Sequence, residues 1–354
     1  VRAAFEDNNN YMKNGVLLRQ VINIIDEINF EQYQERHAFG DIYENILKSL
    51  QSAGNAGEFY TPRAVTDFMV KMISPKLGER IADFACGTGG FLTSALKVLE
   101  PQIQSVNDRT LFTPNVHHDN ALEKNVKDYT ENDKFDVILM NPPYGGSEIE
   151  QIKTNFPIEL RSSETADLFM SVIMYRLKKN GRVAIVLPDG FLFGADNAKV
   201  AIKKKLIETM NLHTIIRLPH SVFAPYTSIT TNILFFDNTQ PTKETWFYRL
   251  DMPEGYKNFS KTKPMKLEHF NEVIDWWHNR QAIEVEGFDK ARRYTAQEII
   301  ERQYNLDLCG FPHEEEEILP PDELIATYQQ KRAALNADID RILADITGIL
   351  GIKL

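Results

Sequence analysis

The sequence predicts an α/β fold in which helices wind around both faces of a mostly parallel, doubly wound sheet. From about residue 57 to about residue 240, apolar runs of strand length alternate with segments of helical periodicity. A glycine-rich turn at 87–90 joins one apolar run to a helical segment, and another run, VILM at 137–140, stops at a pair of prolines. Ends of strands such as these are where open α/β sheets bind ligands.

Four segments are expected along the chain. Residues 1–50 are the end of an N-terminal helical domain, because apolar side chains in 16–50 recur at three and four. Residues 51–250 hold the sheet, and residues 251–320 form an irregular, aromatic-rich extension. Residues 321–354 form a C-terminal helix with an apolar seam at Tyr328, Leu335, Ile339, Ile342, Ile346 and Ile349. Such a seam packs either on its own domain or on a partner helix.

Composition limits the class of protein. The chain has 354 residues, of which 43% are hydrophobic and 25% charged, as in a globular protein with a large core. Its longest apolar runs fall well short of the ~20 residues that a membrane helix needs, and its first residues lack the features of a signal peptide. Two cysteines, Cys86 and Cys309, cannot make a disulfide framework. We therefore expect a cytoplasmic protein with no membrane contact.

The formal net charge of −10 disfavours a protein that coats nucleic acid through phosphate neutralisation. Any contact with DNA must then be local or shared with a partner.

The first informative motif is IADFACGTGGF at 81–91. Its glycines permit a tight turn and let a ligand lie against bare backbone, with the amides of the following helix facing it. The spacing fits neither G-x-G-x-x-G nor the P-loop pattern. From the residues alone, nucleotide, dinucleotide and methionine-derived cofactors and a purely structural turn all remain open.

The second motif, Asn141-Pro142-Pro143-Tyr144, resembles motif IV of methyltransferases that act on exocyclic amino groups, above all the N6 amine of adenine in DNA. The prolines end the strand, since neither donates a backbone hydrogen bond. The Asn141 amide oxygen and the Pro142 carbonyl can then accept the two hydrogens of a conjugated amine and aim its lone pair at a methyl donor. Tyr144 would stack on a base taken out of the duplex.

Beside that motif, residues 81–91 resemble motif I of S-adenosylmethionine-dependent methyltransferases, and GEFYTP at 57–62 resembles motif X, which packs on the cofactor. A carboxylate at the strand end suits a sulfonium cation. The cofactor-binding residues that the resemblance implies are Gly57, Phe59, Tyr60, Thr61, Pro62, Asp83, Cys86, Gly87, Thr88, Gly89, Gly90, Phe91, Asp119, Asn120 and Asn141.

Each of these assignments has a plainer alternative. Thr61-Pro62 also fits a helix start, with Thr61 as N-cap and Pro62 as the first helical residue. Asp119 also fits an ordinary turn. Cys86 is not expected to be a nucleophile, because no base or cation stands near it in sequence. In HSVFAPYTSITTNILFF, Phe223 or Tyr226 would wall the pocket of the target base, but both also fit sheet-core aromatics.

Together with ETADLFM at 164–170 and GRVAIVLPDGFLFG at 181–194, these motifs resemble the modification subunit of a type I restriction-modification system. The resemblance implies that 51–250 is a catalytic methyltransferase domain, and that the protein is an adenine-specific DNA methyltransferase using S-adenosyl-L-methionine. It implies a separate specificity subunit, a second modification subunit, a restriction subunit that can join them, and double-stranded DNA. We expect the C-terminal helix 321–354 to dock the specificity subunit.

The sequence departs from the family between Leu99 and His118. The family's sheet has there a second strand, carrying an acid for the cofactor ribose, and a helix, which the residues present are too few to form. We expect that a segment is missing around Arg109 to Pro114, and the ribose-binding acid has no candidate.

Two other functions remain open at this stage. Asn-Pro-Pro-Tyr chemistry would also serve the methylation of a glutamine side-chain amide in a protein, because that nitrogen is equally planar. The chain would otherwise be a noncatalytic scaffold that binds the cofactor.

Overall fold

The computed structural model describes residues 61–310, except 114, 225, 226, 228 and 261, together with residue 19 and scattered positions between 325 and 342. The predicted helical domain at residues 1–50 therefore lies outside the described residues, apart from Arg19. The chain divides into two compact units, Val1–Cys309 and Gly310–Leu354.

The first unit is built on one eight-stranded sheet with the order β1-β2-β3-β5-β4-β6-β8-β7. Its strands are β1 (Ile81–Ala82), β2 (Phe135–Met140), β3 (Leu177–Pro188), β4 (Asn211–Arg217), β5 (Thr231–Asp237), β6 (Glu244–Arg249), β7 (Ile283–Val285) and β8 (Phe288–Thr295).

The α/β class is confirmed, but the sheet is more mixed than predicted. The pairs β1–β2, β2–β3 and β4–β6 are parallel, whereas β3–β5, β4–β5, β6–β8 and β7–β8 are antiparallel. One antiparallel pair has a local cause: Glu286 and Gly287 both adopt positive φ, at 54° and 82°, which is the geometry of a two-residue hairpin turn. The parallel part, β1 to β3, carries the two main motifs.

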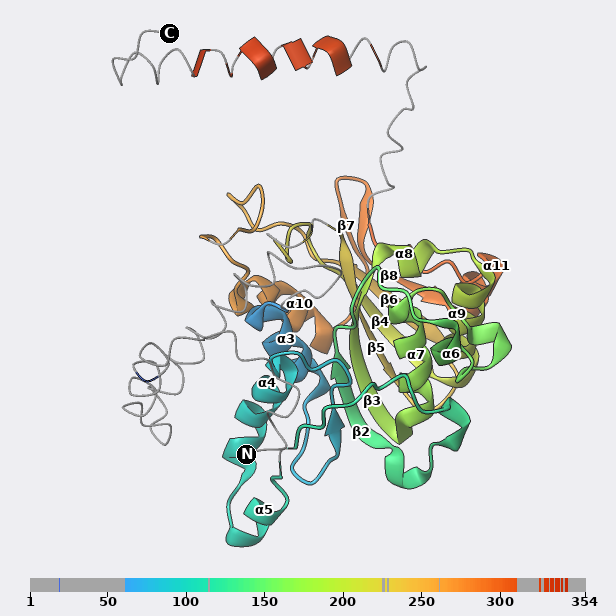
Figure 1. Ribbon diagram of the computed structural model, residues 1–354. Coiled ribbons are helices and arrows are strands. Elements are labelled where there is room, and N and C mark those ends of the chain that lie inside the picture. The colour runs from blue at the N-terminus through green and yellow to red at the C-terminus, as the bar shows by residue number, and fades with distance from the viewer. Residues whose placement is uncertain are drawn as a thin grey trace. The chain divides into compact units, whose positions relative to one another are not determined.

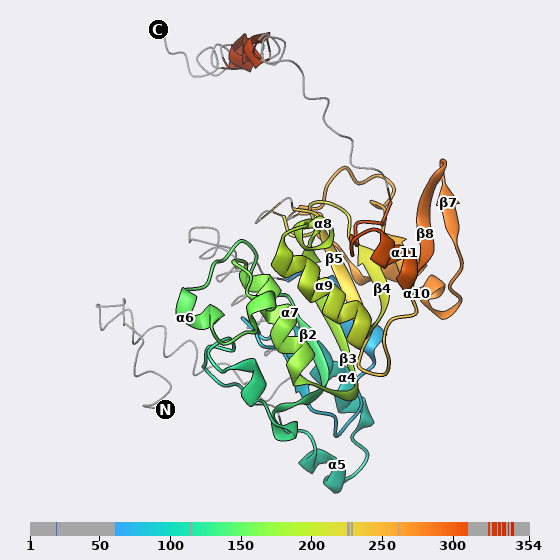
Figure 2. The same ribbon diagram turned by 90° about the vertical axis from the view of Figure 1, so that its right-hand side faces the viewer.

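Helices cover both faces of this sheet, as a doubly wound fold requires (Figure 1). In Figures 1 and 2, α3, α4 and α10 lie on one face and α6, α7 and α9 on the other. The bounds are α3 Arg63–Ile73, α4 Gly90–Leu99, α5 Val106–Thr110, α6 Glu150–Lys153, α7 Thr165–Arg176, α8 Asp189–Phe193, α9 Asn197–Thr209, α10 Asn271–His278 and α11 Ala296–Glu301. Short 3-10 helices lie at Glu100–Gln102, Val126–Asp128, Glu131–Asp133, Ile158–Leu160 and Leu267–Phe270.

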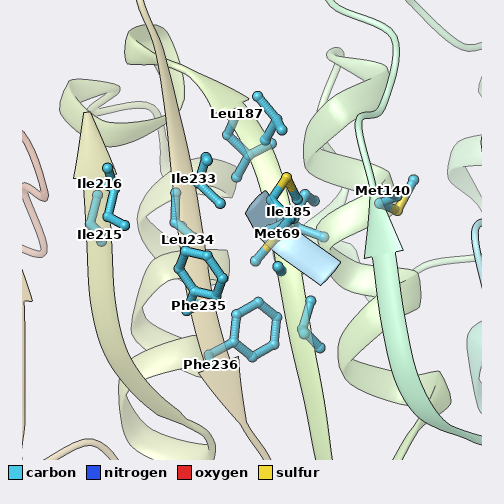
Figure 3. Packing of buried hydrophobic residues seen from close by; sticks show 14 of the residues in the cluster. Met69, Met140, Ile185, Leu187, Ile215, Ile216, Ile233, Leu234, Phe235 and Phe236 are labelled. Carbon is cyan, nitrogen blue, oxygen red and sulfur yellow. The ribbon is translucent and has the colours of Figure 1, made fainter. Parts of the chain in front are cut away.

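The core is formed where these helices press on the central strands (Figure 3). Met69 of α3 and Ile185 of β3 are fully buried at the middle of the sheet. Phe68 of α3 stacks on Phe270 of a 3-10 helix, with ring centres 4.1 Å apart, and meets Phe235 of β5 edge to face at 6.2 Å, which fixes α3 on the sheet. Burying one such side chain stabilises a fold by about 1.5–3 kcal/mol. The core therefore holds α3, which precedes β1 and its glycine turn, in a defined place.

Two expectations about the chain's organisation are wrong. Residues 251–320 are not an irregular extension, because they contain α10, β7, β8 and α11, and β8 pairs with β6 in the main sheet. The sheet therefore continues past residue 250, where the α/β domain was expected to end. The division between the two units falls after Cys309 rather than after residue 320.

The region between α4 and β2 is short, as expected. The described residues there form α5, the 3-10 helices and loops, so β1 is the edge strand of the sheet within the described part of the chain. Among the described residues no helix has both the length and the apolar character needed to cross a membrane.

Candidate active site at the carboxyl ends of β1 and β2

The two main motifs meet at one edge of the sheet. Strands β1 and β2 are parallel neighbours, with Ile81 opposite Val137 and Ala82 opposite Ile138. Their carboxyl ends therefore lead side by side into Asp83 and Asn141. This edge is the ligand-binding edge of an open α/β sheet.

The turn after β1 leaves open space beside its backbone. Gly87 and Gly89 have φ of +49° and +75°, a region that side chains with a Cβ rarely adopt. A Cβ added at either position would meet nothing within 4 Å. The N–H of Gly89 donates to the carbonyl of Cys86 at 2.7 Å, which closes the turn immediately before α4. A ligand can therefore lie directly against this backbone.

Asp83 places a carboxyl group at the start of that turn. Its Oδ1 accepts the N–H of Ala85 at 3.0 Å. Burial raises the pKa of Asp83 to about 7, against its ordinary 3.8, and the hydrogen bond from Ala85 opposes that rise only in part. A positive charge next to the carboxylate would lower this pKa again, so the site favours a cationic ligand.

Asn141 connects the strand end to Thr61 and Tyr144. Its Nδ2 donates to Thr61 Oγ1 at 3.0 Å. Its Oδ1 accepts the hydroxyl hydrogen of Tyr144. Thr61 and Asn141, which are 80 positions apart and belong to two different motifs, are thus in direct contact.

Tyr144 is buried rather than presented on an open surface. The residue is only 5% exposed, and burial raises the pKa of its hydroxyl well above the usual value. Its ring meets that of Phe223 edge to face, with centres 6.5 Å apart. Phe223 is itself 1% exposed, so it packs in the core behind Tyr144.

The helix start at Thr61-Pro62 differs by one residue from the prediction. Helix α3 begins at Arg63, Pro62 occupies the N-cap position, and no side chain caps the helix. The hydroxyl of Thr61 contacts Asn141 instead. Helix α3 also reaches the glycine turn, because Arg63 Nη1 donates to the carbonyl of Gly90 at 3.4 Å.

The remaining predicted site residues differ in how exposed they are. Asp119 and Asn120 lie in an exposed turn, where Asp119 Oδ1 accepts the N–H of Asn120 and Asn120 Oδ1 accepts that of Leu122. These contacts fit the turn-forming alternative. Pro142 and Phe91 are buried, and Thr88 is half-buried in the turn. Gly57, Phe59, Tyr60 and Tyr226 lie outside the described residues.

Cys86 has the surroundings of an inert thiol. Burial, and next the negative charge of Asp83, raise its pKa. A reactive cysteine needs a lowered pKa. The expectation that Cys86 is no nucleophile therefore agrees with its environment.

Two contacts of residues near the motifs had no signal in the sequence. The guanidinium of Arg176, immediately before β3, stands 4.5 Å from the ring centre of Phe84 and 4.7 Å from that of Tyr129, so it packs against the residue next to Asp83. A Cβ on Gly146, just after the tetrapeptide, would lie 2.8 Å from Thr165 Oγ1. This close approach fixes the loop after Tyr144 against the start of α7.

A cavity of about 320 Å³ lies elsewhere. It is lined by His213, Trp246, Arg280 and neighbouring side chains at the amino ends of β4 and β6. Since β4 runs parallel to β3 through their shared antiparallel neighbour β5, this cavity is at the opposite edge of the sheet from Asn141. It is not part of the site described above.

Comparison with known proteins gives a consistent result. The sequence model of the family described as N-6 DNA Methylase matches residues 34–114 and 108–318. The EcoEI type I restriction enzyme methylase subunit of Escherichia coli is 50% identical over 98% of this chain and 76% of its own length. The StySPI methylase subunit of Salmonella potsdam is 24% identical over 76% of this chain and 59% of its own length.

Solved structures resemble the fold closely. A modification subunit from Vibrio vulnificus YJ016, assigned to a type I restriction enzyme, has a TM-score of 0.77 and 40% identity over 87% of this chain and 70% of its own. A structure reported for complex assembly and conformational transition of the type I R-M system has a TM-score of 0.75 and 31% identity over 100% of this chain and 79% of its own.

Proposed function

This chain belongs to the N-6 DNA methylase family, and we infer that it methylates the N6 amine of adenine in DNA as the modification subunit of a type I restriction-modification enzyme. The observation that carries the chemistry is the position of the Asn141 amide, at the end of β2 and next to the strand that leads into the glycine turn. The enzyme is an adenine-specific DNA methyltransferase.

We propose that S-adenosylmethionine is the cofactor and binds at the turn after β1. The open backbone at Gly87 and Gly89 would accept it, and the Asp83 carboxylate would face its positive charge. When bound, it supplies a methyl group on a sulfonium, which needs no metal ion and no general acid for its activation. Asp119 and Asn120, which the motifs also imply, are proposed as further cofactor contacts.

Asn141 and Pro142 would hold the target amine. The Asn141 oxygen and the Pro142 carbonyl each accept one amine hydrogen, so the lone pair turns away from the ring and toward the cofactor side of the sheet edge. Fixed acceptors of this kind lower a barrier because they need no reorganisation during the reaction. Both acceptors are neutral, so this role requires no unusual pKa.

Tyr144 would stack on the extruded adenine. Its buried position means that one face of the ring must open toward the base before stacking can occur. Phe223, packed edge-on behind it, would support that ring rather than touch the base. The pocket assignment of Tyr226 remains a proposal based on its motif.

The partners proposed for this chain are a specificity subunit, a second modification subunit, a restriction subunit and double-stranded DNA. The C-terminal helix is the proposed docking element for the specificity subunit. Five of its apolar side chains, Ile325, Tyr328, Leu335, Ile339 and Ile342, are between 51% and 63% exposed. A helix with such a seam gains stability when another helix covers it.

The function is tested by mixing the chain with tritiated cofactor and DNA, with and without a specificity subunit. Label in N6-methyladenine that depends on the specificity subunit is the expected result. Label on protein glutamine without DNA would instead establish the amide methyltransferase alternative. Cofactor binding with no label on either substrate would leave a scaffold as the function.

A further inference from the structure

We propose that Thr61 is a positioning residue for Asn141: its hydroxyl oxygen anchors the amide nitrogen and thereby presents the amide oxygen to the target amine. This inference rests on the proposed role of Asn141 and adds a residue that acts on the amine side of the reaction. The motif resemblance assigned Thr61 to the cofactor side only.

The contact that carries it is the hydrogen bond from Asn141 Nδ2 to Thr61 Oγ1, at 3.0 Å. The opposite atom of the same amide, Oδ1, accepts from the Tyr144 hydroxyl. In this orientation each polar atom of the amide group has one hydroxyl partner. A carbonyl oxygen has two lone pairs, so Oδ1 can accept an amine hydrogen in addition to that of Tyr144.

Orientation matters because an amide has a donor end and an acceptor end. The terminal torsion of asparagine has a broad energy profile, so an unanchored amide rotates easily. A rotated Asn141 would point its NH2 group at the amine, and two donors would then face each other. The acceptor that aims the lone pair would be lost, although Asn141 would still be present.

The anchor itself is supplied by rigid structure. Thr61 precedes Pro62, the N-cap of α3, and α3 is tied to α4 by a buried hydrogen bond between Thr66 Oγ1 and Ser94 Oγ at 2.9 Å. Ser94 in turn donates to Asp67 at 2.5 Å. A functional group held by packed helices keeps its position better than one on a loop. Through Thr61, the helix pair behind the glycine turn also fixes the group at the end of β2.

The test compares Thr61→Val, which keeps the shape and removes the hydroxyl, with Thr61→Ser, which restores it. Each variant is assembled with a specificity subunit and assayed for kcat and for the Kd of S-adenosylhomocysteine. We expect Thr61→Val to lower kcat by roughly 3- to 10-fold, the worth of one ordinary hydrogen bond, with the Kd unchanged. Thr61→Ser should recover most of that loss.

Thr245→Val is the matched control. Thr245 is a fully buried threonine of β6 whose hydroxyl donates to the carbonyl of Leu212 at 2.6 Å, away from the site. It loses a comparable hydrogen bond and should keep the kcat of the parent chain. A wild-type kcat in Thr61→Val would overturn the proposal. A rise in the Kd of S-adenosylhomocysteine with kcat unchanged would also overturn it, because Thr61 would then act on the cofactor.

A second readout does not depend on activity. In protein labelled with ¹⁵N at asparagine, the side-chain NH2 signals of Asn141 should shift in Thr61→Val and return in Thr61→Ser. Unchanged signals would sink the anchoring role even if the complex proved inactive. An inactive wild-type complex with the expected shift would instead count against the proposed function alone.

Discussion

At the scale of single residues, Asn141 joins the two halves of the site. Its nitrogen and its oxygen contact hydroxyls from different segments, Thr61 before α3 and Tyr144 three residues further on. An aspartate at this position could not donate to Thr61, and an alanine would leave both hydroxyls without this partner. An aspartate could still accept from both hydroxyls, so the two contacts suit Asn141 without requiring an amide.

Replacing Asn141 by Ala should reduce methylation by about 100- to 1000-fold, the usual effect of removing one preorganised polar group from a site. Binding of S-adenosylhomocysteine should stay within about 3-fold, because the open backbone at Gly87 and Gly89 is unchanged. Single-turnover assays and calorimetry measure the two effects. The control is Asn107→Ala on exposed α5; equal activity of both variants would contradict the role of Asn141.

Asp83 gives a prediction about pH. Its pKa is about 7 in the folded chain and near 3.8 when unfolded, so between these values the folded state binds more protons than the unfolded state. The Asp83 carboxyl therefore does not reduce the free energy of unfolding below pH 3.8. As pH rises from 3.8 toward 7, its raised pKa lowers that free energy progressively. Asp83→Asn should stabilise the cofactor-free chain more at pH 8 than at pH 5.

Thermal unfolding of both chains at these two pH values measures the effect. Cofactor binding should also release protons near pH 6, because a positive charge lowers the pKa of Asp83. Equal gains in stability at both pH values would show that Asp83 is already ionised in the folded chain.

At the scale of elements, two glycines at the turn between β1 and α4 face different constraints, Gly89 in its backbone conformation and Gly90 in the packing around it. Gly89 needs a positive φ and has open space around it, whereas the nearest atom to a Cβ on Gly90 would be a methyl of Thr66 at 3.5 Å. The first glycine is required by conformation. The second lies in helix α4, where any residue of suitable size can be helical.

Gly89→Ala should therefore destabilise the chain by about 1–2 kcal/mol, the cost of a left-handed conformation for a residue with a Cβ. Gly90→Ala should cost less, because its contact with Thr66 is of ordinary van der Waals length and alanine favours the helix. Urea unfolding of the two variants measures the difference. A larger loss in Gly90→Ala would mean that packing of α4 on α3 controls this turn.

The edge strand β1 also suggests where further residues belong. The family model matches the chain in two parts, 34–114 and 108–318, which meet at 108–114. We predict that the natural protein carries a segment between Arg109 and Pro114. Peptide mapping that finds these residues contiguous, with no intervening peptide, would refute it.

At the scale of the whole molecule, sequence choice and modification are expected to lie on different chains. The net charge of −10 gives no broad attraction to DNA phosphates. The C-terminal unit carries exposed apolar side chains at helical spacing. Binding of a partner through this helix would place a modification site on DNA that the partner has selected.

Leu335→Lys with Ile339→Lys should abolish co-purification with the specificity subunit, because two charges would then lie in the apolar seam. Pull-down of the assembled complex measures this, and binding of S-adenosylhomocysteine should be unaffected. Gln329→Lys, an exposed polar position of the same helix, is the matched control. Retention of the partner by the double variant would rule out this seam as the docking surface.

The sequence by itself determined the α/β class, the glycine turn and the end of β2, since these follow from local chemistry: glycines that allow positive φ and prolines that cannot continue a ladder. It did not reveal β8, a charged strand whose place depends on pairing with β6, or the mixed direction of the sheet. Only the tertiary structure brought Thr61 to Asn141 and Arg176 to Phe84. These contacts join residues far apart in sequence, and no spacing along the chain encodes them, because they depend on how packed elements meet in space.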